Sequence, residues 1–224
     1  MTTLIYQLGS PIVTKNQDGT LSSVLNTALS NGVVPGDSAT RYYTDFADPI
    51  KPTYSWNRSQ RSSHDAFLAG TLAMYVAPAS ELVDTRAENP NLNYDVAAVP
   101  VTRGGGEQVY ADIQALAIPR GSKNLDGAVL VAEVLTSATQ ESFLANELDL
   151  PSPRRDVELD ASADAYRSTF RLAAINSFVF IDPDPTVTDA LFQRMVDAIS
   201  SGRSSVTESV RKANDELHEL TRVQ

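Results

Sequence analysis

The chain has 224 residues, of which 42% are hydrophobic and 21% are charged, a composition typical of globular proteins that excludes a fibrous or disordered one. Its 28 acidic and 18 basic residues give a formal charge of -10, which disfavours nucleic acid and anionic membrane surfaces as partners. The absence of cysteine excludes disulfides, thiolate metal sites and thiol nucleophiles.

The first part of the chain mixes short apolar runs with turn signals. We predict irregular structure over residues 1–36, with a short helix over 22–29. The first residues show neither the basic segment nor the apolar segment of a secretory signal, so the sequence predicts no export signal in this chain.

The next segment alternates helices with loops. A helix is predicted to start at Asp37 or Ser38 and to stop before Pro49, and the loop that follows holds the chain's one tryptophan, Trp56. Ser62 or Ser63 is expected to cap a second helix that Gly70 ends. A strand over 72–77 and a helix over 79–86 then follow.

Two further strands are predicted over 94–99 and 112–118, separated by a glycine turn over 102–107. From Ser122 onward the pattern is helical, with helices predicted after Ser122 and over 138–148, 161–175, 186–200 and from Ser204 or Ser205 to Leu220. The sequence therefore predicts a mixed α/β protein in which helix dominates.

Catalytic and metal-binding chemistry is sparsely represented. The only two histidines, His64 and His218, give few routes to a catalytic triad or a histidine-based metal site, and no catalytic residue, metal ligand or cofactor is predicted. The triple glycine at 104–106 lacks the following Lys-Ser/Thr of a phosphate-binding loop. The acidic run at 182–185 lacks the glycine of a calcium loop, and we interpret Asp184 or Thr186 as a helix cap.

One octapeptide carries a resemblance to a known family. Phe67-Leu-Ala-Gly-Thr-Leu-Ala-Met74 has the form F-x-x-G-x-x-A-M and resembles an internal stretch of the sugar-type extracellular solute-binding proteins of ABC importers, the maltose-binding-like group. In that pattern the phenylalanine anchors a helix, the glycine turns the chain, and the last two residues begin a buried strand. Segments in the order that this family uses lie at 42–57, 94–100, 115–124, 148–154 and 201–203.

The resemblance runs from about Leu4 to Leu220 but begins partway through the family pattern. It implies a periplasmic-binding-protein-like II fold with an incomplete two-lobe architecture. Residues 1–100 and 141–224 are expected to form a helix-rich second lobe, and 101–140 a segment of the first lobe. Apolar faces at 112–118 and 123–135 would then lack partners, which predicts marginal stability or association there.

The resemblance also implies a function without turnover, in which a sugar is captured between two hinged lobes for delivery to the membrane permease of an ABC importer. It implies an extracytoplasmic location, in the periplasm or as a cell-surface lipoprotein. Aromatic rings match the C–H faces of sugars, and polar groups bind the hydroxyls. The expected ligand-binding residues are Tyr54, Trp56, Asn57, Ser80, Glu81, Phe180 and Asp182.

Each of these residues also has a purely structural interpretation. Trp56 and Tyr54 could belong to the lobe core, Glu81 could favour a helix start, and Phe180 could be buried packing. Better-known members often carry tryptophan where Ala77-Pro-Ala-Ser80 stands here, which argues against a long oligosaccharide ligand. Two alternative functions stay open: a sugar-processing enzyme that uses Glu81 and Asp182 as its carboxylate pair, and an interaction module without transport.

Overall fold

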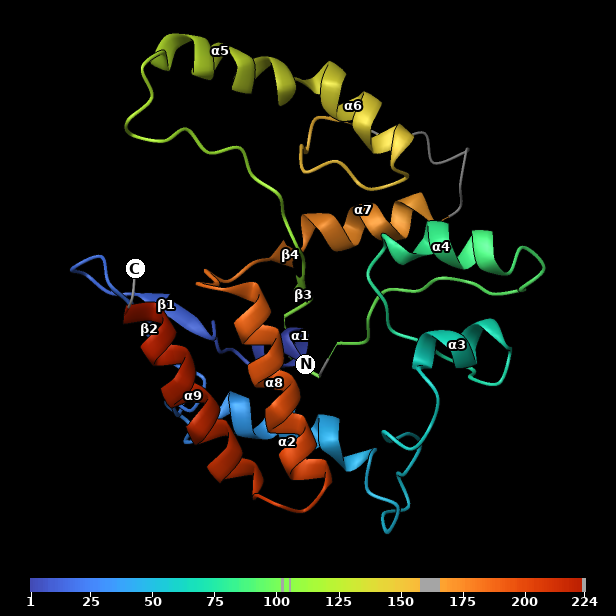
Figure 1. Cartoon of the computed structure of the whole chain (residues 1–224). Coiled ribbons are helices and arrows are strands. Elements are labelled where there is room, and N and C mark those ends of the chain that lie inside the picture. The colour runs from blue at the N-terminus through green and yellow to red at the C-terminus, as the bar shows by residue number, and fades with distance from the viewer. Residues whose placement is uncertain (102, 105, 158–165, 223–224) are drawn as a thin grey trace. The chain divides into compact units, whose positions relative to one another are not determined.

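A computed structural model describes residues 1–101, 103–104, 106–157 and 166–222 (Figure 1). These residues form two units, of which unit 1 comprises residues 1–61, 101–110 and 180–224, and unit 2 comprises 62–100 and 111–179. The boundary between residues 100 and 101 coincides with one of the predicted lobe boundaries. The assignment of segments to lobes stays a prediction.

Unit 1 combines helices with one β-hairpin. Its elements are α1 (Thr2–Gln7), β1 (Val13–Lys15), β2 (Leu21–Ser23), α2 (Pro35–Asp45), β3 (Val109–Tyr110), α8 (Pro185–Ser200) and α9 (Val206–Arg222). Strands β1 and β2 pair antiparallel, with Val13 opposite Ser23 and Lys15 opposite Leu21. Gly19, at φ 89°, makes the turn between them because glycine adopts this conformation without a steric penalty.

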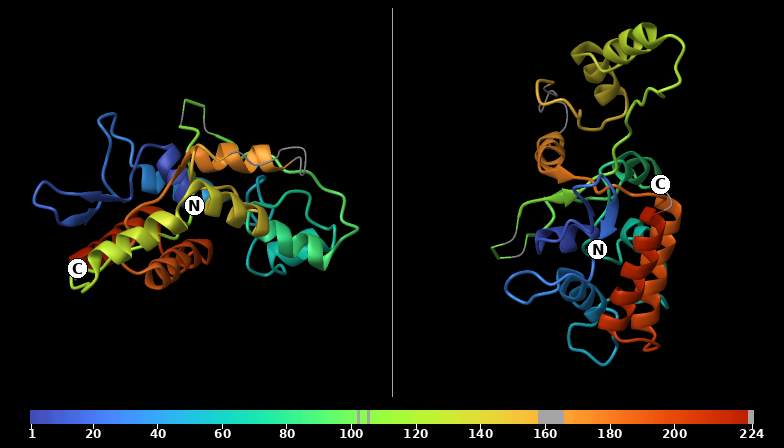
Figure 2. Two further views of the ribbon diagram at one scale, coloured as in Figure 1. Left: turned by 90° about the horizontal axis from the view of Figure 1, so that it is seen from above. Right: turned by 90° about the vertical axis from the view of Figure 1, so that its left-hand side faces the viewer.

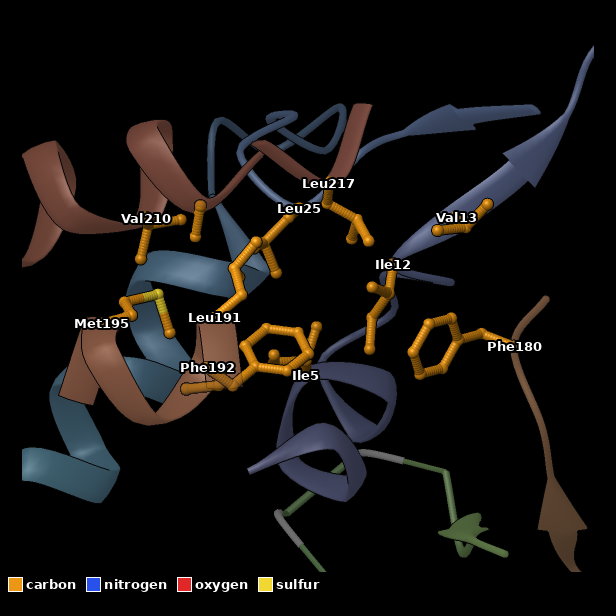
Figure 3. Packing of buried hydrophobic residues seen from close by; sticks show 12 residues of the cluster. Ile5, Ile12, Val13, Leu25, Phe180, Leu191, Phe192, Met195, Val210 and Leu217 are labelled. Atoms are coloured by element: carbon orange, nitrogen blue, oxygen red, sulfur yellow. The ribbon is translucent and has the colours of Figure 1, made fainter. Parts of the chain in front are cut away.

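Helices α8 and α9 lie side by side and contact α2 (Figures 1 and 2). On α9 the buried residues Val210, Ala213 and Leu217 recur at spacings of three and four, which places them on one face. This face packs into the hydrophobic core shown in Figure 3, together with Ile5 of α1 and Leu191 of α8. The core thus joins the two ends of the sequence.

The start of α2 depends on a proline and a glycine, Pro35 and Gly36. Pro35 occupies the first helical position, where its fixed φ suits a helix, and α2 therefore begins before the predicted cap at Asp37 or Ser38. It ends at Asp45, ahead of the predicted stop at Pro49. A Cβ added to Gly36 would lie 2.1 Å from the carbonyl oxygen of Leu25, so this close approach requires glycine.

Unit 2 consists mainly of short helices. Its elements are α3 (Ser63–Leu68), α4 (Glu81–Glu88), α5 (Leu125–Leu135), α6 (Ala138–Glu147), α7 (Arg167–Ile175) and β4 (Ser177–Phe178). Asp149 connects two of the helices, because its carboxylate accepts hydrogen bonds from Arg86 of α4 at 3.3 Å and from Arg167 of α7 at 3.1 Å. The guanidinium of Arg86 also lies over the ring of Tyr166, 5.4 Å from its centroid.

Several predicted helices are confirmed. Ser62 caps α3 by accepting a hydrogen bond from the N–H of Asp65, and Asp184 caps α8 by accepting one from Val187. Helix α6 occupies residues 138–147, close to the predicted 138–148. The predicted helix over 161–175 lies partly outside the described residues, and its described part contains α7.

Four predicted elements are wrong. Residues 22–29 form the end of β2 and turns in place of a helix, and the segments 72–77, 94–99 and 112–118 have no strand structure. The side chain of Met74 is 84% exposed and that of Val76 is 74% exposed, so the strand after the octapeptide is not buried. A strand is stabilised by a neighbouring strand, and no ladder partner is described for these three segments.

The predicted exposure of two apolar faces is confirmed. Helix α5 has no buried residue, and its exposed side chains include Leu130 at 62% and Val131 at 57%. In the segment 112–118, Ile113 and Leu116 are more than half exposed. Both segments of unit 2 thus expose apolar side chains.

Candidate ligand-binding site

The loop that contains Trp56 is anchored to the end of α2. The carbonyl of Phe46, which follows the helix, accepts hydrogen bonds from the N–H groups of Ser55 at 3.0 Å and Trp56 at 3.2 Å. Lys51, earlier in the same loop, forms an ion pair with Asp45 in the last turn of α2. The backbone at Trp56 is thereby fixed, while its side chain is only half-buried.

Asn57 and Arg58 extend this loop. The side-chain oxygen of Asn57 accepts hydrogen bonds from the N–H of Ser59 at 3.0 Å and from its hydroxyl at 2.6 Å. Arg58 forms an ion pair with Asp197 of α8 at 3.3 Å. The predicted residues Tyr54, Trp56 and Asn57 therefore lie in one stretch of unit 1, and each is half-buried.

Phe180 and Asp182 lie in a second segment of unit 1, before α8. The ring of Phe180 is 9% exposed and points into the core beside Ile12, as Figure 3 shows. Its centroid lies 6.0 Å from that of Tyr110. Packing therefore occupies most of the surface that this ring could offer a ligand.

The carboxylate of Asp182 is engaged locally. One of its oxygens accepts a hydrogen bond from the N–H of Asp184 at 3.1 Å and another from the hydroxyl of Thr188 at 2.7 Å. Both donors belong to the start of α8, so Asp182 acts together with the cap at Asp184 in ordering this turn. Both of these hydrogen bonds are accepted by the same oxygen, Oδ1.

Ser80 and Glu81 lie in unit 2, at the start of α4. The hydroxyl of Tyr75 donates a hydrogen bond to a carboxylate oxygen of Glu81 at 2.5 Å. Burial is the main cause that raises the pKa of Tyr75 to about 12, and the hydrogen bond and negative charge of Glu81 raise it further. Glu81 is thus held in one orientation as an acceptor, whereas the side chain of Ser80 is exposed and forms no cap hydrogen bond.

An aromatic cluster of unit 2 was missed by sequence reasoning. The ring of Phe67 lies 5.7 Å from Tyr75 and 5.8 Å from Tyr94, and Tyr94 lies 6.0 Å from Tyr166. The hydroxyl of Tyr166 donates to the backbone carbonyl of Tyr94 at 2.8 Å. Because these residues are up to 99 positions apart without a common motif, no local pattern in the sequence indicated the cluster.

The predicted site residues are therefore divided between the two units. Five lie in unit 1, in the segments 54–57 and 180–182, and two lie in unit 2, at 80–81. The carboxylate pair considered for an enzyme, Glu81 and Asp182, is split in the same way. Among the described residues there is no group of three or more histidine, aspartate or glutamate side chains that could hold a metal ion.

None of the described helices has the length and apolar character of a membrane span.

Comparison with known proteins identifies the fold. The chain resembles a putative oligosaccharide periplasmic-binding protein from Synechococcus sp. MITs9220, with a TM-score of 0.62 and 19% identity over 98% of this chain and 57% of that one. The structure of the same protein in complex with zinc gives a TM-score of 0.57 and 18% identity, over 98% of this chain and 57% of that one. The chain also resembles the GacH receptor of Streptomyces glaucescens GLA.O, which was solved unliganded and with acarbose and an acarbose homolog. Here the TM-score is 0.61 and the sequence identity is 20%, over 98% of this chain and 56% of that one.

The chain thus spans less than three fifths of the length of these structures, and it has the periplasmic-binding-protein-like fold in partial form, as predicted. No curated protein sequence matches it. The sequence profile of bacterial extracellular solute-binding proteins matches residues 2–142, which include the octapeptide at 67–74 and the loop of Trp56. Because this match covers more than half of the chain, the protein belongs to the family of bacterial extracellular solute-binding proteins.

Proposed function

We propose that this chain is the substrate-binding part of an ABC importer and that it captures a sugar between two hinged lobes. The match to the solute-binding family over residues 2–142 carries this proposal. The solved structures with the same fold include a putative oligosaccharide periplasmic-binding protein and the GacH receptor in complex with acarbose, which supports a carbohydrate ligand. The family and these neighbours are binding proteins, and on this proposal the chain captures its ligand without turnover.

The proposal assigns residues 1–100 and 141–224 to the second lobe and 101–140 to the first. The partner that receives the ligand is the membrane permease of the importer, and the location is extracytoplasmic, in agreement with the family. Within unit 1 the best-supported contact residues are Tyr54, Trp56 and Asn57, because their loop is fixed at Phe46 while their side chains are only half-buried. Phe180 is better suited to core packing than to contact with the ligand.

Trp56 provides a direct test, since it is the only tryptophan and every change in indole fluorescence reports on its surroundings. We expect a saturable shift of its emission with one or a few members of a panel of neutral mono- and oligosaccharides. The chain spans under three fifths of its structural neighbours, so we expect weak binding, with a Kd of about 1 mM. Saturation-transfer NMR detects binding of this strength and measures it independently of Trp56.

A matched pair of variants tests the site. Tyr54→Ala should weaken binding about five-fold, because loss of a stacked ring removes on the order of 1 kcal/mol of contact energy. Tyr43→Ala, which truncates a 47% exposed tyrosine of α2, should bind like the wild type. If a chain that is folded by circular dichroism gives no saturation-transfer signal with any sugar, the proposed ligand class is wrong.

A further inference from the structure

Residues 112–118 of unit 2 form an open run of chain that leads to α5 (Figure 1). The segment contains no helix, turn or bend, so its backbone is extended. All of its residues are exposed, including Ile113 at 51% and Leu116 at 58%. Successive side chains of an extended chain point to opposite faces. The segment therefore presents apolar side chains to water on both of its faces.

The backbone of this segment is unpaired as well. The N–H of Ala111 donates a hydrogen bond to the carbonyl of Phe178 at 3.0 Å, and the N–H of Ser122 donates one to Pro119 at 3.0 Å. Between them, no backbone group of residues 112–118 has a hydrogen-bond partner within the described part of the chain. Free N–H and C=O groups along an extended run are a template for a β-strand of another chain. The partner that fits this segment is therefore a strand.

Opposite charges lie at the two ends of the segment. Asp112 stands at its start, Arg120 follows directly after Pro119, and the residues between the two charges are uncharged. Both charged side chains are exposed, and neither forms an ion pair with a described residue. A segment that is negative at one end, apolar in the middle and positive at the other end is complementary to a second copy that runs in the opposite direction.

An antiparallel pair centred on Leu116 matches this charge pattern. Leu116 of one copy then lies opposite Leu116 of the other, and Gln114 lies opposite Ile118. Asp112 of each copy lies opposite Arg120 of the other, which gives two pairs of opposite charges. A parallel pair in the same register would place Asp112 beside Asp112, and like charges directly opposite each other are destabilising.

Pro119 is compatible with this register. If the two copies of Leu116 form a hydrogen-bonded pair, the N–H groups that face the partner belong to even-numbered residues. Pro119 has no N–H, and its odd number places it on the outer edge of the pair, where proline is tolerated. The pairing therefore needs no donor that the sequence lacks.

We propose that residues 112–120 form an interface for a second copy of this chain, in which the two segments pair as antiparallel strands centred on Leu116. The interface lies in unit 2, whereas the proposed sugar contacts at residues 54–57 lie in unit 1. Dimerisation and sugar binding are measured separately, so either proposal can fail without the other.

Sedimentation velocity of the full chain tests the charge pattern. Asp112→Arg and Arg120→Asp each place two pairs of like charges opposite each other, and each should weaken dimerisation about ten-fold at low ionic strength. The combined variant Asp112→Arg/Arg120→Asp restores opposite charges and should dimerise like the wild type. Asp112→Arg also makes the chain less negative, which would strengthen non-specific association in place of weakening it.

A wild-type chain that stays monomeric at about 1 mM overturns the proposal. So does a combined variant that dimerises no better than its two parents, because the effect of each single change is then not due to the pairing of Asp112 with Arg120. Circular dichroism of each variant shows whether the fold is kept.

The absence of cysteine permits a second test. Opposite residues of a hydrogen-bonded antiparallel pair have Cα atoms about 5.5 Å apart, within the range of about 4.4–6.8 Å that a disulfide spans. Leu116→Cys should therefore form a disulfide-linked dimer in air about ten-fold faster than Val76→Cys, which changes a 74% exposed residue of the same unit. Random collisions would link the more exposed position at least as fast, so equal rates contradict the proposed pairing.

Discussion

The surroundings of Tyr75 keep its hydroxyl protonated. Its pKa is raised to about 12 from the ordinary value of 10, first by burial and then by the hydrogen bond and charge of Glu81. The proton is thus bound more tightly in the folded chain than in the unfolded one. The stability linked to this group is fully present below pH 10 and is lost as the pH rises from about 10 to about 12.

Tyr75→Phe should therefore flatten the dependence of the free energy of unfolding on pH between 10 and 12. Absorbance at 295 nm should lose its latest tyrosinate step in this variant, because the group that ionises near pH 12 is absent. Tyr43→Phe changes an exposed tyrosine and should keep that step. If the late step persists unchanged in Tyr75→Phe, another tyrosine produces it and the raised pKa assigned to Tyr75 is wrong.

The type of a residue alone does not distinguish a ligand contact from core packing. An aromatic residue before a helix is compatible with both a ligand contact and core packing. Phe180 proves to be core because it belongs to a hydrophobic cluster with residues of α1, α8 and α9, and these distant segments are not encoded next to Phe180. The same limit explains why the cluster of Tyr75, Tyr94 and Phe67 was not predicted.

At the scale of elements, the start of α8 depends on two aspartates. Asp184 accepts a hydrogen bond from the N–H of Val187 at 3.2 Å, and Asp182 accepts one from the hydroxyl of Thr188. Asp184→Ala should lower the free energy of unfolding by about 1 kcal/mol, measured by urea denaturation, because an N–H at the helix start loses its partner. Asp184→Asn keeps an acceptor oxygen and should unfold within about 0.5 kcal/mol of the wild type. Equal losses in both variants would attribute the effect to charge and not to capping.

Helices were predicted better than strands for a physical reason. The caps at Ser62 and Asp184 act within three residues of the side chain that makes them, so the sequence contains the whole interaction. A strand is completed by a neighbour elsewhere in the chain. Residues 72–77 and 112–118 have strand-like composition, but the described structure gives them no ladder, and composition alone does not reveal this.

At the scale of the whole molecule, unit 2 exposes the apolar side chains of α5, none of which is buried. On α5, Leu130 and Val134 lie four residues apart and therefore on one face, and they are 62% and 54% exposed. Apolar surface of this kind is stabilised by about 25 cal/mol for each Å² that is removed from water.

We expect the chain to associate as its concentration rises, through this apolar face. In sedimentation velocity the mean sedimentation coefficient should increase with concentration for the wild type, and the increase should be reduced in Leu130→Gln/Val134→Gln, which makes the face polar. Val76→Gln is the control, because Val76 is 74% exposed but lies outside α5. It should associate like the wild type, since one isolated apolar side chain contributes little buried area. If the wild-type chain sediments as a monomer at about 1 mM, the exposed face of α5 does not drive self-association, and its hydrophobic residues are tolerated in water.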